Sequence, residues 1–227
     1  MKVILLAAGL GTRLRPITDR IPKCLVPING IPLLGIWLES LHKNNIGPYL
    51  INTHYLAEQV EAFINASDYR DSVVLVNEAT LLGTAGTLKK NIGFFEGDDG
   101  LLIHADNYCL ANFKEFVAAH RNRPNGCLMT MMTFKTDNPS ACGVVELDRD
   151  NVVLRFYEKQ LNPPSNIANG AIYILSKELI NQFKTVFMDA IDFSNDVIPA
   201  LMGKIYTYET NRPLIDIGTV ENYSRIK

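Results

Sequence analysis

The 227-residue sequence is poor in cysteine and histidine and has no long apolar run, and each shortage excludes a class of protein. The four cysteines form no Cys-x-x-Cys pair, which argues against zinc and dithiol redox motifs and predicts free thiols. No apolar stretch approaches the roughly 20 residues of a membrane span, and no secretory cleavage site follows the apolar start, so we expect a cytoplasmic protein. The formal net charge of −2 gives no support to binding of nucleic acid or an anionic membrane.

The two best-known phosphate-binding motifs are also missing. No Gly-Lys-Ser/Thr occurs anywhere, which excludes the P-loop. The dinucleotide fingerprint fails because Leu14 stands where its third glycine is required. The acidic residue expected after the second strand of that fold is absent too, since that strand runs into Asn52-Thr53-His54. Histidine spacing suggests no metal triad, and no Gly-x-Ser-x-Gly elbow is present, so a covalent intermediate is not expected.

What is present is a phosphate loop of another kind. An apolar run at Val3–Ala7 predicts a buried strand, and the loop after it carries Gly9, Gly11, Thr12 and Arg13. Glycines let backbone N–H groups approach phosphates closely, and a guanidinium grips phosphate oxygens with a fork of donors. Lys23 adds a mobile point charge ten residues on. The N-terminal segment therefore predicts nucleoside triphosphate chemistry.

Strand and helix patterns alternate through the first half of the chain, which predicts a mainly parallel sheet with crossover helices. We expect strands near residues 2–7, 49–53, 72–77 and 101–105, and helices near 32–44, 55–66, 84–92 and 112–122. Trp37 falls on the apolar stripe of the first helix and is expected in the core. After residue 125 the pattern is β-rich, at 127–134, 143–147, 152–157 and 171–175. The prediction is a single α/β domain over residues 1–227, Rossmann-like, with a small additional β-sheet over the active-site edge.

Two aspartates follow apolar strand-like runs. Asp106 comes after Leu101–Ala105, and Asp216 ends the run that begins at Pro213. Carboxylates delivered to one sheet edge by different strands suit Mg²⁺, which accepts oxygen ligands and keeps waters and phosphate oxygens. Taken singly, Asp106 could start a turn and Asp216 could cap a helix. Together with the N-terminal loop, they favour a metal site.

The segment 7–28, with Gly-x-Gly-Thr-Arg and then Pro-Lys at 22–23, resembles the signature of the sugar-1-phosphate nucleotidyltransferase family. Later segments also resemble this family, at 83–88, 142–146, 156–159, 169–173 and 216–219. Two positions depart from it: Ala105 stands where relatives usually have glycine, and Val220 replaces a proline. The sequence ends soon after Asp216, so we expect no additional C-terminal domain of the kind that some relatives carry.

The resemblance implies a reaction and a set of roles. A nucleoside triphosphate and a sugar 1-phosphate would form a nucleotide sugar and pyrophosphate, as a step toward cell-surface polysaccharide. Arg13 would hold the departing phosphates, Lys23 the α-phosphate, and Asp106 and Asp216 the Mg²⁺. The nucleotide would contact Ala7, Gly9, Gly11 and Thr12, and its base would lie on Gly83, Thr84 and Gly86. The sugar phosphate would contact Gly143, Glu158, Lys159 and Asn169.

The identity of the substrates is the open part of this interpretation. The Gly-Thr-Ala-Gly segment at 83–86 is most similar to guanylyltransferases acting on mannose or heptose 1-phosphate, which favours GTP; Glu78 is a weaker hint. Alternatives are uridylyl or cytidylyl transfer to another sugar phosphate or to phosphocholine, and a non-catalytic regulatory subunit. Retention of Arg13, Lys23, Asp106 and Asp216 argues against the last. In a simpler interpretation, Thr84 only caps a helix and Glu158–Lys159 is a surface ion pair. The sequence leaves open whether the chain forms a homo-oligomer.

Overall fold

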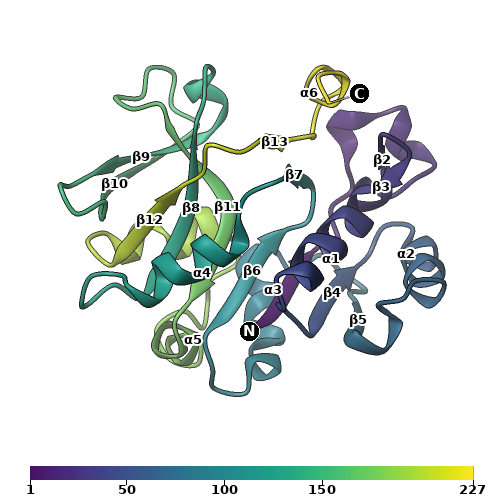
Figure 1. Ribbon diagram of the computed structural model, residues 1–227, viewed down its shortest axis with the longest axis horizontal. Coiled ribbons are helices and arrows are strands. Elements are labelled where there is room, and N and C mark those ends of the chain that lie inside the picture. Colours follow the sequence, from purple (N-terminus) through teal and green to yellow (C-terminus); the bar gives the residue numbers. More distant parts are fainter. Residues whose placement is uncertain (227) are drawn as a thin grey trace. The chain divides into compact units, whose positions relative to one another are not determined.

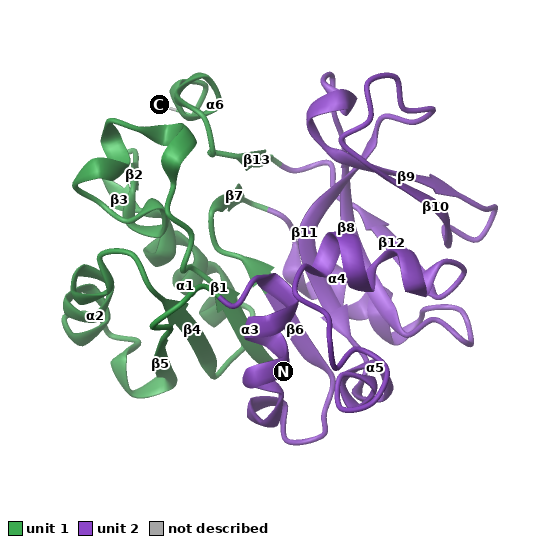
Figure 2. Cartoon of the chain, turned by 180° about the vertical axis from the view of Figure 1, so that it is seen from behind, with its two compact units in different colours: residues 1–81, 103–110, 213–227 green, residues 82–102, 111–212 purple. Residues whose placement is uncertain are grey.

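A computed structural model describes residues 1–226, and the chain in it divides into two compact units (Figure 2). Unit 1 comprises residues 1–81, 103–110 and 213–227, and unit 2 comprises residues 82–102 and 111–212. The protein has a mixed, mostly parallel central sheet with helices, and small antiparallel sheets besides, which confirms the predicted fold class. The expectation of a single domain stays a prediction, because compactness does not show that a unit folds alone.

Unit 1 contains the parallel strands of the N-terminal half. They are β1 (Lys2–Leu6), β4 (Tyr49–Thr53) and β5 (Val73–Asn77), with Val3 opposite Tyr49 and Tyr49 opposite Val73. The middle of β1 and all of β4 are buried, as expected for parallel strands covered on both faces. The helices are α1 (Leu33–Lys43) and α2 (Ala57–Asn65), and α2 packs against β5.

The helix α1 buries the apolar stripe that the sequence predicts. Leu33, Leu34, Leu38 and Leu41 are fully buried, and Trp37 beside them is 1% exposed. The indole Nε1 of Trp37 donates to the carbonyl oxygen of Asn107 at 2.8 Å, so the ring has a partner for its polar atom inside the core. The prediction that Trp37 belongs to the core is confirmed.

A short antiparallel ladder in unit 1 brings the two predicted metal-binding aspartates together. Strand β6 (Gly100–His104) is followed by β7 (Asn107–Cys109), which pairs with β13 (Leu214–Asp216), as Figure 1 shows. In this register Asp216 lies opposite Asn107, the neighbour of Asp106. Helix α6 (Val220–Ser224) follows, with the Thr219 hydroxyl capping its first turn. A second ladder joins β2 (Pro27–Ile28) to β3 (Ile31–Pro32).

Unit 2 holds the β-rich segments. Its strands are β8 (Met129–Lys135), β9 (Gly143–Leu147), β10 (Val153–Glu158), β11 (Ile167–Leu175) and β12 (Ile205–Glu209). They pair antiparallel except for β8 with β12. Its helices are α3 (Thr84–Lys90), α4 (Phe113–Arg121) and α5 (Lys177–Gln182). Strand β11 begins at Ile167, earlier than expected, because Ile167–Asn169 pair with Thr133–Lys135 of β8 ahead of a register shift between Asn169 and Tyr173.

All four cysteines are free, as predicted, and Cys142 alone among them is not buried. No helix within residues 1–226 combines the length and the apolar character needed to cross a membrane.

Candidate active site

The loop after β1 is held in one conformation by a glycine and a threonine. Gly11 precedes the short 3₁₀ helix η1 (Thr12–Leu14) and has a φ of 64°, a left-handed conformation that glycine adopts readily. A Cβ on Gly11 would lie 2.8 Å from Cγ2 of Thr18. The Thr18 hydroxyl donates to the Gly11 carbonyl at 2.7 Å, and the Tyr55 hydroxyl donates to the Thr18 carbonyl at 2.9 Å. The loop is therefore fixed by unit 1 itself.

A cavity of about 330 Å³ opens beside this loop within unit 1. Its lining includes the loop and the groups that the sequence singles out for phosphate and metal: Gly9, Leu10, Gly11, Thr12, Arg13, Lys23, Leu81, Asp106 and Gly218. The guanidinium, the ammonium and the exposed backbone of the loop therefore share one cavity. Such a lining matches the charge and shape of a polyphosphate.

Lys23 joins the two aspartates through its ammonium. It begins the 3₁₀ helix η3 (Lys23–Leu25), and its side chain is only 7% exposed. Its Nζ lies 2.8 Å from Oδ2 of Asp106 and 3.1 Å from Oδ1 of Asp216. Three groups far apart in the sequence thus form one charged cluster, in which the positive charge lies between the two negative ones.

The cluster extends to Arg13 and Gly218. Arg13 Nη2 lies 3.8 Å from Oδ2 of Asp216, with both side chains exposed. The N–H of Gly218 donates to Oδ1 of Asp216 at 2.7 Å, and a Cβ on Gly218 would lie 2.8 Å from that oxygen and 3.1 Å from Arg13 Nη2. Gly218 therefore leaves room for the carboxylate and the guanidinium to approach each other.

The surroundings of Asp106 keep its carboxylate charged. Burial, the largest influence, raises the pKa of Asp106, but the Lys23 ammonium, then His104, and the hydrogen bonds to Asp106 lower it. The net pKa lies below the ordinary value of 3.8, so the group is an anion at neutral pH. The adjacent Cys24 thiol is buried, and burial raises its pKa to about 12, so it is a neutral core group.

The donor chemistry of the cluster fits a hard divalent cation. Within residues 1–226, no group of three or more His, Cys, Asp or Glu side chains could hold a metal ion. Two carboxylates alone suit Mg²⁺, which usually takes one or two protein carboxylates and completes its shell with water and phosphate oxygens. Asp106 and Asp216 are thus the side chains that would hold the ion.

A buried polar network at the ends of β1, β4 and β5 was not predicted from the sequence. Asn52 Oδ1 accepts from the N–H of Ala7 at 2.7 Å, and Asn52 Nδ2 donates to Glu78 Oε1 at 2.9 Å. His54 Nδ1 lies 2.7 Å from the Glu78 carbonyl oxygen, and Glu78 is 2% exposed. The available signal was the polar run Asn52-Thr53-His54 at the end of an apolar strand, which by itself argued only against a dinucleotide site.

The Gly83–Gly86 segment lies in unit 2, where it opens helix α3. Gly83 has a φ of 76° and precedes the helix, and the Thr84 side chain does not cap it. The amides of Ala85 and Gly86 donate to the Ile191 carbonyl at 2.9 and 3.3 Å. These two donors are therefore already bonded within the protein, which limits the backbone groups that this segment can offer to a base.

The residues predicted for the sugar phosphate lie on β9, β10 and β11 of unit 2, except Lys159, which directly follows β10. A Cβ on Gly143 would lie 2.6 Å from Oε2 of Glu158, its partner across the two strands. Lys159 Nζ lies 3.4 Å from Glu158 Oε1, so an ion pair is present. Asn169 uses both ends of its amide: Nδ2 donates to the Tyr173 hydroxyl at 2.7 Å, and Oδ1 accepts from the N–H of Ala171 at 2.9 Å.

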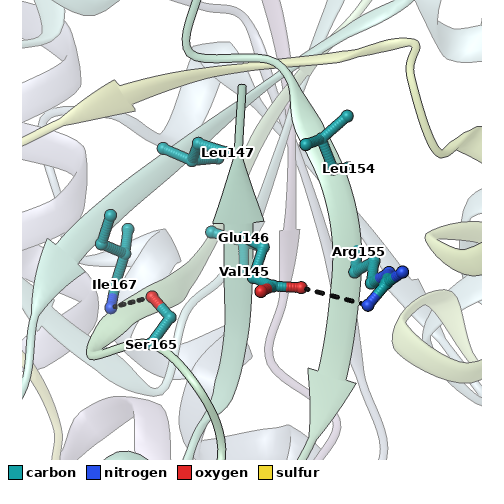
Figure 3. A pocket seen from close by; sticks show the side chains of 7 residues that line it. All are labelled: Val145, Glu146, Leu147, Leu154, Arg155, Ser165 and Ile167. Carbon is teal, nitrogen blue, oxygen red and sulfur yellow. Dashed lines mark hydrogen bonds and ion pairs between the residues drawn. The ribbon is translucent and has the colours of Figure 1, made fainter. Parts of the chain in front are cut away.

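A second cavity, about 660 Å³, lies along β9, β10 and the start of β11 (Figure 3). Arg155 Nη1 lies 3.9 Å from Glu146 Oε2 on the neighbouring strand, and Ser165 Oγ accepts from the N–H of Ile167 at 3.0 Å. None of the residues predicted for substrates lines this cavity.

Comparison with known proteins agrees with this geometry. A family profile described as nucleotidyl transferase matches residues 2–227. A mannose-1-phosphate guanyltransferase of Candida albicans is 29% identical over 231 residues, which cover 98% of this chain and 62% of that protein. A UTP–glucose-1-phosphate uridylyltransferase of Synechocystis is 30% identical over 242 residues, with 98% and 61% covered. The crystal structure of HddC from Yersinia pseudotuberculosis complexed with GMP-PN matches with a TM-score of 0.82 and 28% identity, covering 99% of this chain and 97% of that one.

The chain spans about 62% of the length of the curated relatives that it matches first. The family profile nevertheless covers the chain from its second residue, including the glycine loop, Lys23 and both aspartates of the cluster. The chain belongs to the nucleotidyl transferase family.

Proposed function

We propose that the protein transfers a nucleotidyl group from a nucleoside triphosphate to a sugar 1-phosphate and releases pyrophosphate. The observation that carries this proposal is the unit 1 cavity, which Arg13, Lys23, Asp106 and the glycine loop line together. Membership of the nucleotidyl transferase family and relatives named for sugar-1-phosphate substrates support it.

The reaction is a direct displacement at phosphorus. A phosphate oxygen of the sugar 1-phosphate forms a bond to the α-phosphorus, and the bond from that phosphorus to the bridging oxygen of the β-phosphate breaks. The electron pair leaves with pyrophosphate. The attacking phosphate is already an anion near neutral pH, so no side chain has to remove a proton. The barrier lies in bringing anions together and in the charge that grows on the leaving group.

The residues of the cavity would meet these demands. Arg13, 65% exposed on its side chain, would hold the β- and γ-phosphates with its fork of donors. Lys23 would neutralise charge at the α-phosphate as the two substrates meet. Asp106 and Asp216 would hold Mg²⁺, which when bound would supply positive charge to phosphate oxygens. Of the loop, Gly9, Gly11 and Thr12 would offer backbone groups to the phosphates, as would Ala7 at the end of β1.

We infer GTP as the preferred nucleotide and mannose or heptose 1-phosphate as the acceptor. Relatives are named mannose-1-phosphate guanyltransferase, and the solved HddC structure carries GMP-PN. Glu78 adds a physical reason, because it places a buried carboxylate at the end of β5. Guanine presents N–H groups on its Watson–Crick edge that a carboxylate accepts, whereas adenine presents an acceptor at N1. In unit 2, Gly83, Thr84 and Gly86 would adjoin the base, and Gly143, Glu158, Lys159 and Asn169 the sugar phosphate.

The second candidate is uridylyl transfer to glucose 1-phosphate, because a relative named for that activity is as similar as the guanyltransferases. Both candidates share the cavity and the chemistry, and they differ only in the base and the sugar. A pyrophosphate-release assay separates them, with five triphosphates (GTP, ATP, UTP, CTP and dTTP) crossed with mannose, heptose and glucose 1-phosphates.

The expected result is the highest kcat/KM with GTP and a mannose or heptose 1-phosphate. A pyrimidine triphosphate that exceeds GTP by tenfold or more with any sugar phosphate would refute the guanylyl assignment and leave the reaction class intact. Absence of pyrophosphate release with every pair would refute the reaction class. Glu78→Gln supplies the matched variant: it should narrow the ratio of GTP to ATP, because an amide can present a donor where the carboxylate only accepts.

A further inference from the structure

The 191–196 turn of unit 2, which runs into the short π-helix η7 (Phe193–Val197), supplies the partners of the Gly83–Gly86 segment. The carbonyl oxygen of Ile191 accepts from the amides of Ala85 at 2.9 Å and Gly86 at 3.3 Å. A Cβ on Gly83 would lie 2.5 Å from the same oxygen. Gly83 therefore has to be glycine for the turn to approach this closely, and the turn occupies the first free amides of α3.

The same turn bonds the side chain of Thr84. The N–H of Phe193 donates to Thr84 Oγ1 at 2.7 Å, and that hydroxyl lies 3.4 Å from Oδ2 of Asp192 as a donor. The ammonium of Lys89 adds a hydrogen bond to the carbonyl of Met188, just before the turn. The conformation at the start of α3 is thus set by the 191–196 turn as much as by the helix.

On its other side the turn contacts Asn169 through Tyr173. The rings of Phe193 and Tyr173 lie 4.7 Å apart between centroids, and both side chains are fully buried. The Tyr173 hydroxyl accepts from Asn169 Nδ2 at 2.7 Å and hydrogen-bonds to the Ser194 side chain. One six-residue turn therefore connects a segment predicted for the nucleotide with a residue predicted for the sugar phosphate.

Asp196 holds this turn in place. Its Oδ2 accepts from the N–H groups of both Ile191 and Asp192, each at 2.8 Å. These two backbone hydrogen bonds hold the pKa of Asp196 below its ordinary value of 3.8, and the one from Asp192 has the larger effect. Asp192 reinforces the turn, because its Oδ1 accepts from the backbone and side-chain amides of Asn195 at 2.8 and 2.9 Å. Bonds to a carboxylate are the stronger kind of hydrogen bond, so one side chain fixes where the Ile191 carbonyl points.

We propose that Asp196 is a positioning residue for nucleotidyl transfer, holding the 191–196 turn so that it orients the Gly83–Gly86 segment and Asn169 together. The proposal rests on the proposed function, since it concerns how the two substrates are held. Asp196 itself would touch neither substrate. It acts through the Ile191 carbonyl on one side and through Phe193 and Ser194 on the other.

The test compares Asp196→Ala, Asp196→Asn and the control Asp189→Ala in the full chain. Asp189 is an exposed aspartate just before the turn, so its removal matches the change in charge. Asp196→Ala should raise the KM values for triphosphate and sugar 1-phosphate together by about tenfold each, with a smaller fall in kcat. Asp196→Asn keeps an acceptor oxygen and should restore most of both KM values. Ser194→Ala should raise the KM for the sugar phosphate alone.

Hydrogen exchange of residues 83–90 in the ligand-free protein gives a readout that needs no turnover. Asp196→Ala should speed exchange at Ala85 and Gly86, and Asp189→Ala should not. Equal KM values in Asp196→Ala and Asp189→Ala, or unchanged exchange at the two amides, would overturn the proposal. If Asp196→Ala does not fold, Ser194→Ala decides it: a raised KM for the sugar phosphate would support the proposal, and both KM values unchanged would count against it. A wild-type protein without turnover would refute the proposed function, while the exchange measurement would still test the turn.

Discussion

The ammonium of Lys23 lies 2.8 Å from Oδ2 of Asp106, although η3 and the end of β6 are far apart in the sequence. The lysine also lies 3.1 Å from Asp216, so its single positive charge lies against both carboxylates that would hold a divalent cation. A cation bound by these carboxylates would compete with Lys23 for the same oxygens. The ammonium would then be available to a phosphate, which links metal binding to the charge of the substrate.

This arrangement predicts opposite effects of Lys23→Met on metal binding and on turnover. The ligand-free variant should bind Mn²⁺, a spectroscopic substitute for Mg²⁺, more tightly than wild type, because no internal cation opposes it. Its kcat should fall by about 100-fold or more, since a charge on the reacting phosphates is lost. Mn²⁺ titration followed by electron paramagnetic resonance and steady-state kinetics measure the two effects. Weaker Mn²⁺ binding in Lys23→Met would contradict the competition.

Asp106→Ala and Asp216→Ala should each lower kcat by about 100-fold or more while the fold is retained, because each removes a carboxylate proposed to hold the metal. Circular dichroism and thermal unfolding check the fold, and pyrophosphate release measures kcat. Asp71→Ala, at an exposed position of η4 (Arg70–Ser72) in unit 1, is the control for loss of an aspartate. A kcat within about threefold of wild type for either cluster variant corresponds to less than about 1 kcal/mol and would argue against the carboxylate pair.

The strand and helix pattern of unit 1 could be predicted because its signals are local. An apolar run followed by Gly9 and Gly11 marks a strand and a loop, and the stripe that contains Trp37 marks a buried helix face. Asp106 and Asp216 could be assigned to one edge because each follows an apolar strand. What the sequence did not predict is that Lys23 lies between them, since that contact depends on how η3 places its first residue.

The contacts that could not be predicted from the sequence are hydrogen bonds of backbone groups to residues far away along the chain. The Ile191 carbonyl bonds the start of α3, yet no periodicity or motif marks residue 191 as a partner of Gly83. Asn52 is similar, because its partner is the backbone N–H of Ala7. Strands β7 and β12 were also not predicted from the sequence. Strand β7 has only three residues, too few for an alternation of apolar and polar side chains to be recognised.

Gly11→Ala should destabilise the protein by about 1–2 kcal/mol, from the left-handed conformation alone, and more if Thr18 cannot move. The melting temperature should fall by about 2–8 °C for a chain of this length. Gly9→Ala is the matched stability control in the same loop, because a Cβ there would meet no atom within 4 Å. Differential scanning calorimetry compares them, and equal melting temperatures for the two variants would exclude strain at Gly11.

Thiol labelling should distinguish Cys142 from the other cysteines. Cys24 and Cys109 are at most 2% exposed and Cys127 is 6% exposed. Burial raises the pKa of Cys24 to about 12 and also raises the pKa of Cys127, so little thiolate forms at pH 8. Native protein treated with iodoacetamide and analysed by mass spectrometry should carry its modification on Cys142. Equal labelling of Cys24 would show that the core around Lys23 opens readily.

The contact between the buried His120 and the half-buried Asp99 should make stability depend on pH. His120 Nδ1 lies 2.7 Å from Thr130 Oγ1, and its Nε2 lies 3.4 Å from Asp99 Oδ2. Burial, the largest influence, lowers the pKa of His120 below its ordinary value of 6.5, although Asp99 opposes this. As the pH drops through 6.5, His120 is protonated in the unfolded chain before it is protonated in the folded protein. The free energy of unfolding therefore falls as the pH drops through 6.5.

The contact with His120 is also the largest influence that lowers the pKa of Asp99 below 3.8, so a second loss of stability begins only at more acidic pH. His120→Gln removes the titrating group and keeps a side chain that can bond Thr130. At pH 7.5 the variant should have a lower melting temperature than wild type, since a buried ring is lost. The difference between the two melting temperatures should become smaller as the pH falls to 5. Melting temperatures recorded across this range by calorimetry test the linkage. A difference in melting temperature that grows toward pH 5 would mean that His120 is a cation in the folded protein, with a pKa above 6.5.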